Sequence, residues 1–107
     1  MAKALMERRF HEAMLSLYKK AKAECGYNSP RFLQMVNDRG GLQTAQSLLH
    51  TPSLSEGFTA LWQKGRLDLT VEKLVLDRQW QDLFSDEERE IARKRLSELG
   101  YLPSGHE

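Results

Sequence analysis

Apolar residues in this chain recur at the three- and four-residue spacing of a helical face, and short segments that end or begin helices separate the runs. The longest run covers residues 2–24, where Phe10, Met14, Leu17 and Ala21 share one face and charged side chains occupy the other. This pattern predicts an amphipathic helix that packs one side against a core. The chain is therefore expected to be all-α.

Capping residues divide the rest of the chain into about five more helices. Ser29-Pro30 has the chemistry of a helix start and predicts a helix through residue 38. Gly40-Gly41 fits the end of that helix, because glycine adopts the left-handed conformation without strain. A short helix over residues 42–49 and a turn at residues 51–53 are expected to follow.

Two further helix starts lie in the second half of the chain. Ser55, with a glutamate directly behind it, can cap a helix that ends near Gly65. Ser85-Asp86-Glu87-Glu88 has the pattern of a capping box, in which the serine hydroxyl and the glutamate carboxylate each accept a bond from the other residue's backbone amide. This box predicts a last helix that runs to Gly100.

Residues 67–71 alternate apolar and polar side chains, which is compatible with either a short strand or a helix start. We favour the helix, because Asp68 or Thr70 can cap it and Glu72 suits its first turn. A lone strand would also lack a pairing partner elsewhere in the chain. The predicted fold is a compact array of about six short-to-medium helices with no sheet.

Length and composition indicate one globular domain over residues 1–107, with residues 102–107 as a frayed tail. The chain is 40% hydrophobic and 29% charged, which is typical of a folded protein and excludes a disordered one. No apolar run approaches the roughly 18 residues of a bilayer span. The basic N-terminal segment lacks the apolar stretch of a secretory signal. We therefore expect a cytoplasmic protein without a membrane partner.

Cysteine and histidine form no recognisable site. Cys25 is the only cysteine, which excludes an intramolecular disulfide and a Cys-rich metal centre. A nucleophilic thiol with His11 or His50 as its base remains formally open, but a structural cysteine is the better interpretation. His11, His50 and His106 lack the spacing of metal ligands, so no metal is expected.

Asp68, Glu72 and Asp77 are the nearest approach to a carboxylate cluster for metal or nuclease chemistry. The first two occupy the positions of a helix cap and a first turn, and Arg66 is placed to form an ion pair with Asp68. A structural role is therefore favoured. We expect no catalytic residue, no cofactor and no small-molecule substrate.

Charge is distributed unevenly along the chain. Residues 1–54 contain eight Lys or Arg against four Asp or Glu, and residues 55–107 contain eight against eleven. Basic side chains of the first half could contact phosphates or an acidic partner, although a solvated helix surface is the simpler interpretation. The candidates are Arg8, Arg9, Lys19, Lys20, Lys22, Arg31 and Arg39.

Aromatic residues provide a second set of candidate contacts. Trp80 and Phe84 lie in a short segment between two predicted helices, where they either complete the core or face a partner. Core packing is the first explanation for each of them.

From about Tyr18 onward the chain resembles a family of short bacterial proteins and C-terminal domains without an assigned function. The resemblance covers about three quarters of the chain and implies a helical accessory module, but it assigns no activity to individual residues. The residues that carry it include the segments 26–27, 31–36, 40–41, 44–45, 48–49, 57–58, 61–62 and 66–72, with Trp80, Leu83 and Phe84.

These observations favour a small non-enzymatic accessory subunit of a larger bacterial complex, which binds another protein or itself. The alternative is a nucleic-acid-binding domain that uses the basic N-terminal helix. Opposite charge in the two halves and the absence of an assembled catalytic pattern favour the first hypothesis.

Overall fold

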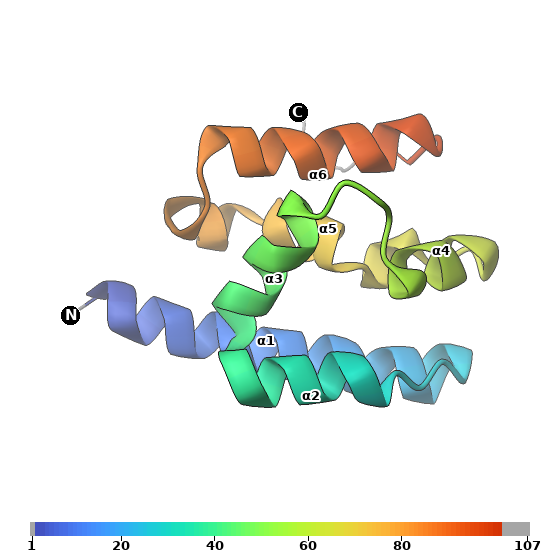
Figure 1. Cartoon of the computed structure of the whole chain (residues 1–107), viewed down its shortest axis with the longest axis horizontal. Helices are drawn as coiled ribbons and strands as arrows, with labels where there is room; N and C mark the ends of the chain where they lie inside the picture. Colours follow the sequence, from blue (N-terminus) through green and yellow to red (C-terminus); the bar gives the residue numbers. More distant parts are fainter. Residues whose placement is uncertain (1, 102–107) are drawn as a thin grey trace.

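The computed structural model describes residues 2–101, and within this range the chain forms six α-helices and two short 3₁₀ helices without a strand (Figure 1). Their bounds are α1 Ala2–Cys25, α2 Pro30–Arg39, α3 Gly41–His50, α4 Glu56–Gln63, η1 Leu67–Leu69, α5 Val71–Val75, η2 Arg78–Leu83 and α6 Asp86–Glu98. The all-α prediction is confirmed, as is the choice of a helix start over a strand at residues 67–71. The predicted tail at residues 102–107 lies outside the described residues.

The helices form two layers that α3 connects. Figure 1 shows α1 and α2 side by side in one layer and α6 in the other, with α3 running across the space between them. Accordingly, α3 contacts α1 at its beginning and α6 at its end. The radius of gyration is 12.9 Å, close to the value of about 13 Å for a compact domain of 100 residues.

Side chains at the predicted N-caps begin the helices as expected. The hydroxyl of Ser29 accepts from the Phe32 amide at the start of α2, and that of Ser55 accepts from the Phe58 amide at the start of α4. At α6 the capping box is complete, since Ser85 Oγ accepts from the Glu88 amide at 3.1 Å while Glu88 Oε1 accepts from the Ser85 amide at 2.9 Å. These contacts satisfy amides that the helix itself leaves unpaired.

A close approach at Gly41 sets the crossing of α3 over α1. Gly40, at φ +90°, is both the C-cap of α2 and the N-cap of α3. The Gly41 amide donates to His11 Nδ1 at 2.9 Å, and a Cβ at Gly41 would lie only 2.6 Å from the His11 Cα. Only glycine lets the two backbones come this near.

Candidate binding pocket

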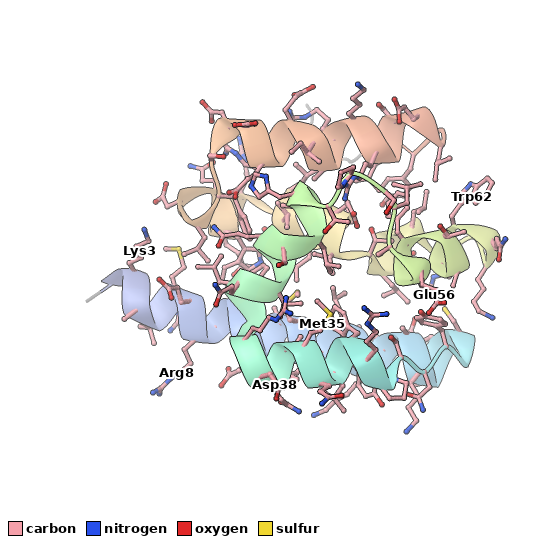
Figure 2. All side chains as sticks on the ribbon, viewed as in Figure 1. Lys3, Arg8, Met35, Asp38, Glu56 and Trp62 are labelled. Atoms are coloured by element: carbon pink, nitrogen blue, oxygen red, sulfur yellow. The ribbon has the colours of Figure 1, made fainter. Side chains whose placement is uncertain are left out.

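A pocket of about 560 Å³ opens between the layer formed by α1 and α2 and the segments that face it, which are the α3–α4 linker, α4, η1 and the start of α5. Figure 2 shows Met35 of α2 and Glu56 of α4 on facing sides of this space. The volume falls within the range of about 300–1,000 Å³ that is typical of ligand pockets. Its apolar lining is Leu17, Ala21, Phe32, Met35, Leu48, Phe58, Leu61, Leu69 and Val71, and its hydroxyl lining is Tyr18, Tyr27, Ser29, Ser47, Thr51, Ser53, Ser55 and Thr70.

Two of the predicted basic residues, Arg31 and Arg39, line this pocket. Both are exposed, and neither forms an ion pair within residues 2–101. Among residues 2–101, the side chain of Arg39 makes one hydrogen bond, a 3.4 Å contact from Nη1 to Ser47 Oγ. The described residues contribute two carboxylates to the lining, Glu56, which is exposed, and Glu72, which is buried. The mouth of the pocket therefore presents more positive than negative charge.

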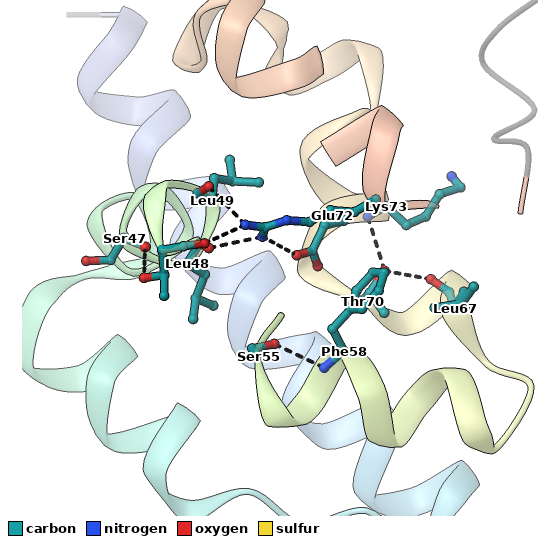
Figure 3. A network of polar contacts seen from close by, with 11 residues as sticks. Ser47, Leu48, Leu49, Ser55, Phe58, Leu67, Thr70, Glu72 and Lys73 are labelled. Carbon is teal, nitrogen blue, oxygen red and sulfur yellow. Dashed lines mark hydrogen bonds and ion pairs between the residues drawn. The ribbon is translucent and has the colours of Figure 1, made fainter. Parts of the chain in front are cut away.

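An arginine from α6 fixes the wall of the pocket between α3 and α4. Arg95 Nη1 donates to the Leu48 carbonyl at 3.1 Å, and Nη2 donates to the carbonyls of Leu49 at 3.2 Å and Thr51 at 2.6 Å (Figure 3). The same guanidinium pairs with Glu72 Oε2 at 3.0 Å. Arg95 thus satisfies carbonyls that end α3 and ties them to α5.

Glu72 and Arg95 form an ion pair with little access to water. The side chain of Glu72 is 3% exposed and that of Arg95 is 10% exposed. Burial raises the pKa of Glu72, because desolvation disfavours the carboxylate, while hydrogen bonds from its own backbone amide and from Arg95 act in the opposite direction. The pair closes the floor of the pocket without offering a free charge there.

Thr70 completes the floor beside this pair. Its hydroxyl donates to the Leu67 carbonyl at 2.7 Å and accepts from the Lys73 amide at 3.2 Å, so it ends η1 and caps α5 (Figure 3). With both roles filled, this hydroxyl holds the turn between η1 and α5.

The remaining basic candidates, Arg8, Arg9, Lys19, Lys20 and Lys22, are all on α1 and do not line the pocket. Figure 2 shows Arg8 directed away from the body of the molecule. The structure therefore divides the predicted basic set into a pair at the pocket and a group spread along α1.

Trp80 and Phe84 are buried. They are only 4% and 5% exposed, and both rings meet Phe10 edge-on with centroids 5.4 Å and 5.2 Å away. Their possible role as partner-facing aromatics is corrected: Trp80 on η2 and Phe84, the residue that ends η2, both pack into the core. The tryptophan at the surface of the described part of the chain is Trp62, which is 45% exposed on α4 (Figure 2).

The thiol and the two candidate bases have separate surroundings. Cys25 is half-buried, with Arg66 Nη1 4.0 Å from its sulfur. His11 accepts from Gly41, while His50 contacts Glu88 at 2.9 Å. Each imidazole therefore forms a hydrogen bond with a residue of another helix.

The acidic candidates near residue 68 also have structural contacts. Asp68 pairs with Arg66 at 3.0 Å, as predicted, and Arg66 also reaches Glu24 of α1 at 2.7 Å. The hydrogen bond from Arg66 lowers the pKa of Asp68, with partial burial opposing it. Arg66 thereby joins η1 to the end of α1.

Glu88 links the end of α3 to the start of α6. Burial acts to raise its pKa, but hydrogen bonds from the Ser85 amide and from His50 outweigh it, so the pKa of this carboxyl lies below its usual value. Glu88 is therefore held as a carboxylate that joins two helices.

Among residues 2–101, no group of three or more His, Cys, Asp or Glu side chains is arranged to hold a metal ion. In the same range, no helix combines the length and the apolar character that crossing a bilayer requires. Comparison of the chain with protein-family models, curated proteins and solved structures gave no match.

Proposed function

We propose that this chain is a small non-enzymatic protein-interaction module, an accessory subunit of a larger bacterial complex, and that the pocket between α2 and α4 is its binding site. The observation that carries the proposal is the position of Arg31 and Arg39 at the mouth of an apolar pocket, where neither pairs with a carboxylate of residues 2–101. Unpaired guanidiniums beside apolar side chains are typical of surfaces that recognise an acidic and apolar partner.

The chemistry of the lining supports binding over catalysis. It supplies hydroxyls, two guanidiniums and two carboxylates, and one of these carboxylates, Glu72, is engaged by Arg95. Within the described part of the chain, no imidazole, amine or thiol lines the pocket beside a hydroxyl that it could activate. A binding role uses the groups that are present.

The test is affinity purification of the tagged chain from its native cells, with nuclease treatment, in three forms. The wild type is compared with Arg31→Glu/Arg39→Glu and with the matched control Arg8→Glu/Arg9→Glu, which makes the same charge change on exposed residues outside the pocket. We expect a defined protein that resists nuclease, is absent with the first variant and is retained by the control. Equal recovery by both variants, or no protein partner at all, would overturn the proposal.

Nucleic-acid binding through α1 is the second candidate, and it is favoured by the five basic side chains on this helix, which form no ion pair within residues 2–101. If Arg8 and Arg9 neutralise phosphates of duplex DNA, the slope of log affinity against log salt should become shallower by about 0.9 for each phosphate that a variant leaves unneutralised. Binding to a labelled duplex, measured across salt concentrations for wild type and Arg8→Ala/Arg9→Ala, tests this candidate. An unchanged slope removes it.

A further inference from the structure

The face of α2 at the pocket carries a regular charge pattern. Arg31, Met35 and Arg39 follow at intervals of four residues, so they lie along one side of the helix, and all three line the pocket. Met35 points into the space towards α4 (Figure 2). At a rise of 1.5 Å per residue, the two arginine positions are about 12 Å apart with the methionine midway between them.

The opposite wall has free backbone groups. The linker over residues 51–55 has extended backbone at both ends, with φ −79° and ψ 126° at Thr51 and φ −70° and ψ 158° at Ser55. Within residues 2–101, the backbone groups of Ser53 and Leu54 make no hydrogen bond. Residues 51–53 form a bend between these two ends, and the unpaired N–H and C=O groups of the exposed residues Ser53 and Leu54 can bond to the backbone of a bound extended peptide.

These two walls fit an extended peptide. In an extended chain every second side chain faces the same way, and residues four apart are separated by about 13 Å. Two acidic side chains at that separation match Arg31 and Arg39, and the side chain between them meets Met35. A helical partner would leave the backbone groups of the linker unpaired, and a single free carboxylate would satisfy only one guanidinium.

We propose, building on the interaction function above, that the pocket binds an extended segment of a partner protein in the pattern acidic-x-apolar-x-acidic. The acidic side chains pair with Arg31 and Arg39, the apolar side chain enters the pocket at Met35, and the peptide backbone pairs with residues 53–54. The spacing of the two acidic side chains provides specificity, and burial of the apolar side chain against Met35 provides affinity.

A random peptide library displayed on phage, selected on the immobilised chain, tests the pattern without assuming a partner. We expect enrichment of two acidic residues four apart with an apolar residue between them. The best peptide, labelled with fluorescein, is then measured by anisotropy beside a permuted peptide in which the two acidic residues are adjacent. Permutation, or Arg31→Glu/Arg39→Glu in the protein, should weaken binding at least about tenfold, and Arg8→Glu/Arg9→Glu should not.

The outcomes separate this inference from the proposed function. Peptides that bind the pocket without the acidic spacing overturn the inference and leave the interaction function standing. The inference is also overturned if no peptide is enriched on the wild-type chain relative to Arg31→Glu/Arg39→Glu. The purification experiment alone then decides the proposed function. Far-UV circular dichroism establishes that each variant keeps its helix content, so loss of binding reports on the site.

Discussion

Replacing Arg95 with methionine tests how the chain tolerates a buried ion pair. Methionine keeps much of the apolar stem and removes the guanidinium, so Glu72, with a side chain only 3% exposed, is left without its partner. Breaking one side of such a pair typically costs about 3–5 kcal/mol, because the remaining charge stays buried and uncompensated. At about 4 °C per kcal/mol for a domain of this size, Arg95→Met should lower Tm by about 12 °C or more.

The double variant Glu72→Leu/Arg95→Met should recover part of this stability. It removes both charges, so only the carbonyls of Leu48, Leu49 and Thr51 are deprived of a donor, and Thr51 is exposed to water. We expect it to cost about 1–3 kcal/mol, less than the single variant although it carries one more substitution.

Acid should reduce the cost of the single variant. Because burial raises the pKa of Glu72, binding of a proton to this carboxyl favours the folded state. This contribution to stability is fully present below the ordinary pKa of 4.5 and is lost as pH rises through the pKa of the folded state. Removing Arg95 raises the folded pKa of Glu72 further, and each added unit costs about 1.4 kcal/mol at neutral pH. The destabilisation by Arg95→Met is thus largest near pH 7 and shrinks towards pH 5.

Urea denaturation followed by far-UV circular dichroism, near pH 7 and near pH 5, measures these differences in the free energy of unfolding. The reasoning is refuted if the double variant is as unstable as Arg95→Met, or if the cost of Arg95→Met does not change with pH. Either result would mean that the hydrogen bonds from Arg95 to the carbonyls, and not the charge on Glu72, determine the effect.

Three further outcomes are expected. Gly41→Ala should cost about 1–3 kcal/mol in chemical denaturation because its methyl group meets the backbone of α1, whereas Gly57→Ala should be neutral or stabilising; equal effects would contradict the close approach. Acrylamide should quench the fluorescence of exposed Trp62 but not of buried Trp80, so Trp62→Phe should resist quenching. Because the pKa of Glu88 is lowered, its stabilisation is present above its ordinary pKa of 4.5 and is lost as pH falls. Glu88→Gln should therefore flatten the acid side of the stability profile.

Local signals make most of the helices predictable. The capping hydroxyls at Ser29, Ser55 and Ser85 act within a few residues of their own position, so sequence alone identifies them. The apolar spacing at Phe10 and Met14 likewise predicts burial, and both side chains are inaccessible to water. The helix η2 is not predicted, because its short 3₁₀ turns lack an apolar period of their own.

Contacts between segments that are far apart in the sequence cannot be predicted from capping residues or apolar spacing. The sequence identifies Gly41 as part of a helix end, but only the crossing of α3 over α1 reveals why a side chain cannot fit there. Arg95 lies near the end of its own helix, and nothing local in the sequence indicates that its guanidinium reaches the end of α3 and a buried carboxylate. The four-residue spacing of Arg31, Met35 and Arg39 is visible in the sequence, but its meaning depends on the wall that faces it.

The linker over residues 51–55 is held by Arg95 at Thr51 and also forms part of the proposed binding site. A variant that releases the linker without unfolding the chain can therefore show whether the linker contributes to peptide binding. Arg95 holds the carbonyl of Thr51 at one end of the wall that contains Ser53. In Glu72→Leu/Arg95→Met the linker is released from this anchor while the chain stays folded. We expect native helix content with weaker binding of the selected acidic peptide, measured by anisotropy. Unchanged affinity would contradict a role for the linker backbone in recognition, because a wall released from its anchor could not present the same groups to the peptide.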